Sequence, residues 1–200
     1  MTKVIYLHGF SSAGSTGTAV HLRNYLYQEY GVSVISPDIP VMPSEAMIFL
    51  KQLVETEQPD LIIGTSMGAM YAETLKGFRR ICVNPAFQMS KLLTFRYLNK
   101  NVDFQNTRQD GATSFKVDKQ MVAEFKEIET NQTLKGITAD EKKLVWGLFG
   151  KDDPFVNFQK EFVKAYGKAQ FRVIEGEHSL TQAMMKRDLL PLVKDILGLG

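Results

Sequence analysis

A glycine-serine-glycine pattern lies near the middle of the chain, in the run Gly64-Thr65-Ser66-Met67-Gly68. The apolar run LII precedes it and the run AMYAETL follows it, so the serine should stand on a tight turn between a strand and a helix. Side chains in place of either glycine would collide with neighbouring backbone in such a turn. This context favours a nucleophile over the alternative, a surface serine in a glycine-rich turn.

A serine hydroxyl needs a base that removes its proton, and the chain has three histidines. His178 follows the last predicted strand, in the run GEHS, and is the candidate base. His21 lies within the first predicted helix, where we expect it to be partly exposed. His8 precedes Gly9 after the first predicted strand, and we expect it to fix the loop that it begins.

A histidine base needs a carboxylate that holds its other ring nitrogen as a donor. Two adjacent carboxylates, Asp152 and Asp153, follow the apolar run LVWGLF. We favour Asp153, because a glycine, two residues, the acid and then an apolar residue three positions further on is a frequent arrangement for such an acid. The alternative is Asp152, which we expect instead to cap the loop or to face solvent.

Acyl transfer also needs two hydrogen-bond donors for the charge that develops on the carbonyl oxygen. The backbone N–H of Met67, directly after the serine, is one candidate. The loop HGFSSAG after the first strand should supply the N–H of Phe10 as the other, with Gly9 letting the backbone turn inward. Three scattered histidines lack the spacing of metal ligands, so we expect no metal and assign no cofactor.

Short apolar runs alternate with segments of helical period along most of the chain, which predicts repeated βαβ units and a parallel sheet of about six strands. The strands are nearly continuous in valine, isoleucine and leucine, as expected when helices cover both faces of a sheet. The predicted strands are 4–9, 32–36, 60–66, 80–84, 142–150 and 170–176, and the predicted helices are 16–30, 43–58, 67–77, 156–166 and 180–197.

This rhythm breaks at about 86–141, a segment too long for an ordinary connection between a helix and a strand. It has one plausible helix, at 117–129. We interpret it as a cap-like insertion over the strand ends, with a loose surface excursion as the alternative. Its apolar residues either line an acyl pocket or pack the insertion onto the body; they are Phe87, Met89, Leu92, Leu93, Phe95, Tyr97 and Phe104.

The composition fits one domain spanning residues 1–200, with 44% hydrophobic and 23% charged residues. The net charge is +2 and no basic run could track a phosphate backbone, so nucleic acid is not an expected partner. The single cysteine, Cys82, lies in an apolar run, where a buried free thiol is favoured over a catalytic one. Without a signal-peptide core or a membrane span in the sequence, we expect the cytoplasm.

The chain order nucleophile, acid, base is that of α/β-hydrolases, with helices on both faces of the sheet as a three-layer fold. The runs IYLHGFSS, SPDIP, IIGTSMGAMYA, VNPA and GEH together resemble the YqiA/YcfP family of small bacterial α/β-hydrolases. That family is regarded as esterase-like, so the resemblance implies triad roles for Ser66, Asp153 and His178.

Two classes of function follow for a scaffold of this kind. The first is a serine hydrolase that cleaves a small-molecule carboxylic ester or thioester through an acyl-enzyme. The second is a protein that binds a small molecule without catalysis on an α/β-hydrolase scaffold. A complete triad favours the enzyme, because a pure binder need not keep all three groups.

Overall fold

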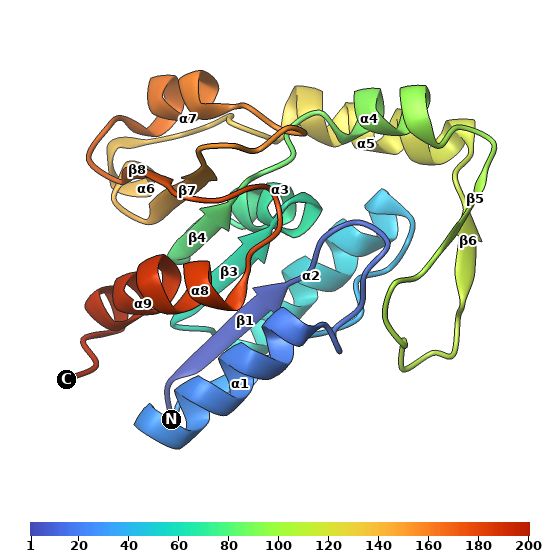
Figure 1. The fold of residues 1–200 in the computed structure, drawn as a ribbon. Helices are drawn as coiled ribbons and strands as arrows, with labels where there is room; N and C mark the ends of the chain where they lie inside the picture. Colours follow the sequence, from blue (N-terminus) through green and yellow to red (C-terminus); the bar gives the residue numbers. More distant parts are fainter.

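Six parallel strands form the central sheet of the computed structural model, which describes residues 1–200 (Figure 1). The strands are β1 (Lys3–Leu7), β2 (Ser33–Ile35), β3 (Leu61–Thr65), β4 (Arg80–Val83), β7 (Val145–Gly150) and β8 (Phe171–Ile174). Their order in the sheet is β2-β1-β3-β4-β7-β8, and every neighbouring pair is parallel. The predicted α/β fold with six parallel strands is confirmed.

Helices cover both faces of this sheet and give three layers. One face carries α1 (Gly17–Tyr30) together with the C-terminal helix, which is interrupted by a π-helical turn at Met185–Leu189 between α8 (Gln182–Met184) and α9 (Leu190–Leu197). The other face carries α2 (Pro43–Glu57), α3 (Met67–Thr74) and α7 (Gln159–Tyr166).

Successive residues of a strand point to opposite faces, and β1 shows how this divides the core. Val4 and Tyr6 belong to the apolar cluster under α1 and α9, whereas Ile5 and Leu7 belong to the cluster under α2 and α3. Both faces of β1 are therefore buried, as its continuous apolar sequence predicts. The edge strand β8 differs, because Val173 remains 47% exposed.

The segment between β4 and β7 contains more regular structure than its sequence indicates. Its elements are α4 (Met89–Arg96), β5 (Asn101–Asp103), β6 (Ser114–Lys116), α5 (Lys119–Asn131) and α6 (Ala139–Lys142). The predicted helix at 117–129 corresponds to α5, whereas α4, α6 and the antiparallel hairpin of β5 and β6 were not predicted. The interpretation of this segment as a cap stays a prediction.

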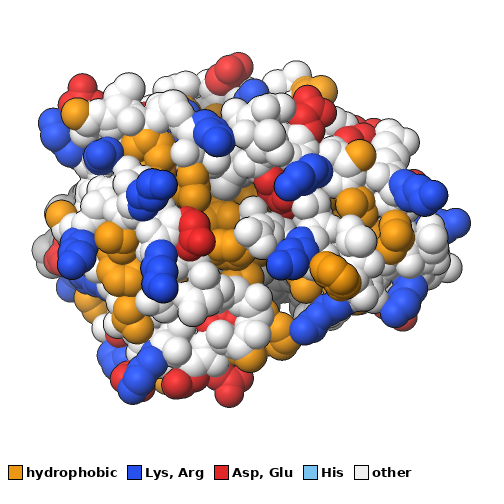
Figure 2. Space-filling model, turned by 90° about the horizontal axis from the view of Figure 1, so that it is seen from above, with side chains coloured by type: hydrophobic (Ala, Val, Ile, Leu, Met, Phe, Trp, Pro, Cys, Tyr) orange, Lys and Arg blue, Asp and Glu red, His pale blue; other side chains and the backbone are white.

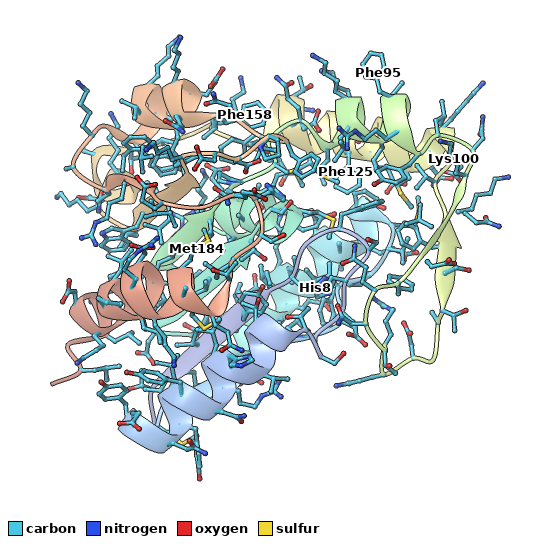
Figure 3. All side chains as sticks on the ribbon, in the orientation of Figure 1. His8, Phe95, Lys100, Phe125, Phe158 and Met184 are labelled. Atoms are coloured by element: carbon cyan, nitrogen blue, oxygen red, sulfur yellow. The ribbon has the colours of Figure 1, made fainter.

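The insertion packs on the body through α5, whose buried residues are Met121, Phe125 and Ile128. Phe125 points from α5 toward the body, where its ring centroid lies 6.2 Å from that of Tyr71 in α3 (Figure 3). Helix α4 lies beside α5, and both lie beyond the carboxyl ends of the strands (Figure 1). None of the helices is both long enough and apolar enough to cross a bilayer.

Candidate active site

Ser66 stands on the sharp turn between β3 and α3, with backbone angles φ 55° and ψ −117°. A non-glycine residue is rarely found at positive φ, so this conformation is strained. The flanking glycines leave no room for side chains. A Cβ at Gly64 would overlap the carbonyl of Gly68, and a Cβ at Gly68 would overlap the carbonyl of Leu7. The predicted steric reason for both glycines is therefore confirmed.

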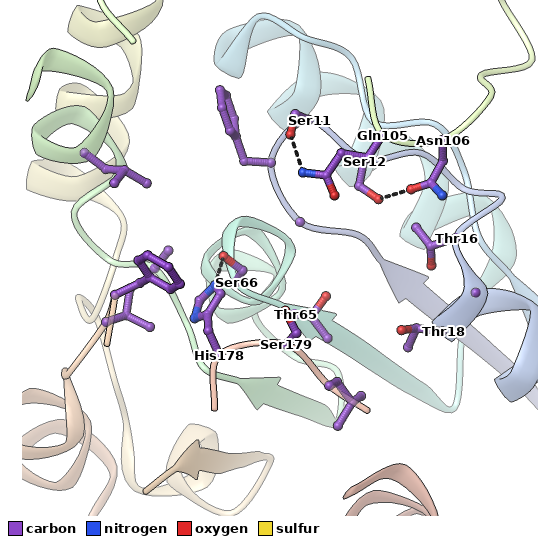
Figure 4. A pocket seen from close by; sticks show the side chains of 18 of the residues that line it. Ser11, Ser12, Thr16, Thr18, Thr65, Ser66, Gln105, Asn106, His178 and Ser179 are labelled. Atoms are coloured by element: carbon purple, nitrogen blue, oxygen red, sulfur yellow. Dashed lines mark hydrogen bonds between the residues drawn. The ribbon is translucent and has the colours of Figure 1, made fainter. Parts of the chain in front are cut away.

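The His178 ring lies between Ser66 and Asp153, and Figure 4 shows its hydrogen bond with Ser66. Its Nε2 is 2.9 Å from Ser66 Oγ, and its Nδ1 is 2.7 Å from Asp153 Oδ2. Because the carboxylate can only accept, Nδ1–H donates to it and leaves Nε2 free to accept from the serine hydroxyl. The structure brings these three predicted residues together from the ends of β3, β7 and β8.

The Asp153 carboxyl is buried, with 2% of its side chain exposed. Its Oδ1 accepts hydrogen bonds from the backbone N–H groups of Phe155 and Val156, at 2.8 and 3.1 Å. Burial raises the pKa of this carboxyl, but the hydrogen bond from His178 and the two backbone donors outweigh burial and hold the pKa below its ordinary value. Asp153 is therefore held as a carboxylate at neutral pH.

Asp152 occupies a different environment, although it is the next residue along the loop. Its side chain is exposed, and its backbone N–H donates to the Gly176 carbonyl at 3.1 Å. It does not contact His178, which hydrogen bonds to Asp153. The geometry thus fits the choice of Asp153 over Asp152.

Asn84 positions the histidine loop, a role that sequence reasoning missed. Its side chain is buried at the end of β4, and its Nδ2 donates to the carbonyls of Glu177 and His178 at 3.1 and 2.8 Å. Its Oδ1 accepts from the Gly150 N–H at 2.7 Å. One amide side chain thus joins the ends of β4 and β7 to the loop after β8. The sequence feature that could have indicated this role is the position of Asn84, a polar residue directly after the apolar run ICV.

The loop after β1 lies beside Ser66, as required for a second donor. A Cβ at Gly9 would be 3.5 Å from Ser66 Cβ, which is ordinary contact. The Phe10 N–H makes no hydrogen bond within the chain, and Met67 begins α3, where an N–H has no partner in the helix. Gly9 is not among the residues at positive φ; the left-handed residue of this loop is Ser11, with φ 54°, and the role expected for Gly9 stays a prediction.

The other two histidines and the cysteine lie outside this group. His8 is buried: its Nδ1–H donates to the Gly9 carbonyl at 2.9 Å, and its Nε2 accepts from the Ile39 N–H at 3.1 Å. It thus fixes the loop, and burial lowers its pKa. His21 is exposed on α1. Cys82 is fully buried in β4, and burial raises its pKa to about 12, so its thiol is a poor nucleophile.

A cavity of about 440 Å³ opens over Ser66 and His178 (Figure 4). Hydroxyl and amide side chains lie together on one side of these two residues; they are Ser11, Ser12, Thr16, Thr18, Thr65, Gln105, Asn106 and Ser179. The lining also includes Arg96 and eight apolar or aromatic side chains; these eight are Tyr6, Phe10, Ala86, Leu92, Tyr97, Phe155, Val156 and Leu180. No Asp or Glu lines the cavity.

The insertion supplies only part of the apolar lining that its sequence offers. Leu92 and Tyr97 line the cavity. Phe87, Met89 and Leu93 instead pack in the core. Phe95 points outward from α4 and is 78% exposed, and Phe104 packs on Phe115 (Figure 3). Both sequence interpretations therefore hold for different residues. No group of three or more potential metal ligands is present.

Comparison with known proteins gives a family and a fold. A model of the uncharacterised protein family UPF0227 matches residues 3–193. Est1E from Butyrivibrio proteoclasticus is 16% identical, with a TM-score of 0.70 over 98% of this chain and 88% of that chain. The monoacylglycerol lipase of Paleococcus ferrophilus is 15% identical, with a TM-score of 0.63 over 98% and 94%. The thioesterase domain from the curacin biosynthetic pathway is 14% identical, with a TM-score of 0.57 over 98% and 91%. These likenesses show the α/β-hydrolase fold.

Proposed function

This chain belongs to the uncharacterised protein family UPF0227, the YqiA/YcfP family, and on that premise we propose that it is a serine hydrolase of small carboxylic esters or thioesters. The observation that carries the proposal is the hydrogen-bonded chain from Ser66 through His178 to Asp153, at 2.9 and 2.7 Å. Three groups from three strand ends have the order and geometry that nucleophilic catalysis requires. A protein that only binds its ligand would not need this arrangement.

In the proposed reaction, Ser66 Oγ attacks the carbonyl carbon while His178 Nε2 takes the hydroxyl proton. The backbone N–H groups of Met67 and Phe10 stabilise the charge on the carbonyl oxygen. The bond to the leaving group then breaks, and His178 returns its proton to the departing alcohol or thiol. Asp153 holds the imidazole in the required tautomer and stabilises its protonated form.

The acyl group is now carried on Ser66 and must be removed by water. His178 takes a proton from that water as it attacks the acyl carbon. The bond between the acyl carbon and Ser66 Oγ then breaks, and His178 returns the proton to Oγ, which restores the hydroxyl and releases the acid. The cavity of about 440 Å³ is of the size that small-molecule sites have. The names of the structural neighbours, an esterase, a lipase and a thioesterase, support ester or thioester substrates for this chain.

The first test is labelling with a fluorophosphonate probe, because only a serine activated by a base attacks phosphorus readily. The wild-type protein should carry one adduct, which peptide mapping places on Ser66. Ser66→Ala should carry none. Ser179→Ala, which removes a hydroxyl from the same cavity, should still be labelled. An unlabelled wild type would overturn the assignment and favour a binding role, whereas an adduct that persists in Ser66→Ala would place the nucleophile at another residue.

The second measurement is hydrolysis of 4-nitrophenyl esters and acyl thioesters of graded chain length. The ratio of their kcat/KM values separates an esterase from a thioesterase. Turnover should fall in acid, because a base that already carries a proton cannot accept another. A rate independent of pH between neutral and acidic solution would argue against His178.

A further inference from the structure

One arginine lies in the cavity wall without a carboxylate partner. Arg96 ends α4 of the insertion and lines the cavity over Ser66. Its guanidinium makes no ion pair with any Asp or Glu and donates no hydrogen bond within the chain. By contrast, Arg80, Arg108 and Arg187 each pair with a carboxylate. Arg96 therefore presents an uncompensated positive charge to the cavity.

An aromatic ring holds this guanidinium near the triad. The Arg96 Cζ lies 5.2 Å from the ring centroid of Phe155, in the loop that carries Asp153. The Phe155 ring in turn meets the His178 ring edge to face, at 5.5 Å between centroids. A cation over an aromatic face is oriented but keeps its charge and its N–H donors. The guanidinium thus lies one aromatic ring away from His178 and keeps its N–H groups available for an anion.

A second cavity, of about 250 Å³, continues from the first past Arg96 and Phe155. Both cavities share Ala86, Leu92, Arg96, Phe155 and Val156 in their walls. The additional lining of the second is mainly apolar; it comprises Gln88, Met89, Lys91, Phe95 and Phe158.

The charged lining residues of the second cavity are Lys91 and Arg96, both from α4, and no Asp or Glu lines it. Seen from above, basic side chains border exposed apolar ones on the face that includes α4 (Figure 2). Mainly apolar walls with positive charge from Arg96 and Lys91 suit a short carbon chain that carries an anionic group.

We propose that Arg96 selects substrates that carry a carboxylate or phosphate a few carbon atoms from the scissile carbonyl, with the carbon chain in the second cavity. The inference rests on the proposed function, since it names the substrate class of the same site. The planar guanidinium can donate two parallel hydrogen bonds to such an anion, and Lys91 adds a second positive charge in the wall of the second cavity. The hydroxyl and amide side of the first cavity then takes the other half of the substrate.

The anion can belong to the acyl half or to the leaving half of the ester, and two substrate pairs distinguish these cases. The first pair is mono-4-nitrophenyl glutarate against 4-nitrophenyl butyrate, which share a leaving group. The second pair is 3-carboxyphenyl acetate against phenyl acetate, which share an acyl group. Each kcat/KM is divided by the rate constant for alkaline hydrolysis of the same ester, so that intrinsic reactivity cancels.

Wild-type protein should prefer the anionic ester by about tenfold in at least one pair, the effect expected from one hydrogen bond between charged groups. Arg96→Gln should lose that preference, and Arg96→Lys should keep part of it. Arg172→Gln is the matched control, because this substitution removes the same charge. Arg172 is exposed on β8 and lines neither cavity. The preference should also weaken at high salt.

A preference ratio of about one in both pairs overturns the inference, and so does a preference that Arg96→Gln retains. Because each ratio compares two esters on one preparation, a variant that is partly unfolded does not distort it. Failure of the proposed function has a different signature. In that case the wild type hydrolyses neither neutral ester through Ser66 and takes up no fluorophosphonate.

Discussion

The strand-end loops and the insertion between β4 and β7 face each other across one cavity, yet different contacts hold them. Close packing of backbone fixes the strand ends, since Gly68 lies directly against the Leu7 carbonyl, and the Asn84 side chain adds hydrogen bonds to the backbone of the histidine loop. Hydrogen bonds hold the insertion. The Gln105 N–H donates to the Ser11 carbonyl at 2.8 Å, and Gln105 Nε2 donates to Ser11 Oγ at 3.1 Å.

Side-chain hydrogen bonds also join α4 to α5 within the insertion and the insertion to the body. Between the two helices, Glu129 accepts from the backbone N–H and the hydroxyl of Ser90, at 2.7 and 2.5 Å. At its return to the body, buried Glu73 accepts from the Leu134 N–H at 3.1 Å, and buried Arg80 pairs with Glu141. Each of these side-chain contacts can be removed by a single substitution without changing the others. The comparison therefore suggests that the strand ends govern the chemical step and the insertion governs which substrate is accepted.

The largest effect should come from the acid on the strand-end side. Asp153→Asn keeps the shape of the side chain but no longer fixes the imidazole tautomer, and this should lower turnover by about 10⁴-fold. Asp152→Asn is the matched control. Its side chain is exposed, so it should lose no more than about tenfold, or roughly 1.4 kcal/mol.

Activity and denaturant midpoints are measured on both variants, so that lost catalysis is separated from lost structure. If Asp152→Asn is inactive instead, the acid of the triad is Asp152 and not Asp153. If both variants stay active, the acid does not come from this loop.

The next effect concerns the second donor for the carbonyl oxygen. Gly9→Val should place branched methyl groups against Ser66 and displace the Phe10 N–H, at a cost of about 100- to 1000-fold in turnover. Gly9→Ala is the control, because its Cβ would have 3.5 Å to Ser66 Cβ and 3.8 Å to the Thr65 carbonyl. Steady-state kinetics on an activated ester measures both. Near-normal turnover of a folded Gly9→Val would place the donor elsewhere.

On the insertion side, Glu129→Gln should weaken the attachment of α5 to α4. Loss of a charge-assisted hydrogen bond should reduce the free energy of unfolding by about 1.5 kcal/mol. Because α4 lines the cavity, KM should rise while kcat changes little. Glu127→Gln on the same helix is the control, since Glu127 is exposed and makes no hydrogen bond through its side chain. A fall in kcat with unchanged KM in Glu129→Gln would contradict the division between the two regions.

The smallest effect is a pH dependence of stability from His8 on the strand-end side. Burial lowers the pKa of His8 in the folded protein. As the pH falls below the ordinary histidine range, near 6.5, the unfolded chain therefore takes up a proton that the folded protein does not, and stability declines. His8→Gln should show a smaller decline between pH 7.5 and 5.5. Denaturant midpoints at the two pH values measure it, and equal declines in both proteins would rule out His8 as the source.

The sequence alone was sufficient for the features that local chemistry specifies. Apolar runs of strand length predict the six parallel strands, and the glycines around Ser66 predict the turn, because backbone crowding at that turn excludes side chains at Gly64 and Gly68. Chain order then predicts His178 and one of two aspartates. Their geometry agrees with these predictions, and their catalytic roles stay a proposal.

Only the tertiary structure decided the features that depend on residues distant in sequence. Asn84 binds the backbone of residues 177 and 178, because the loops after β4 and β8 lie together at one edge of the sheet. Arg96 of α4 meets Phe155 of the loop after β7. The hairpin of β5 and β6 has strands of only three residues each, too short for their alternation to distinguish a strand from a loop. Local patterns report steric fit and burial, whereas the partner of a polar side chain is fixed only when distant segments pack together.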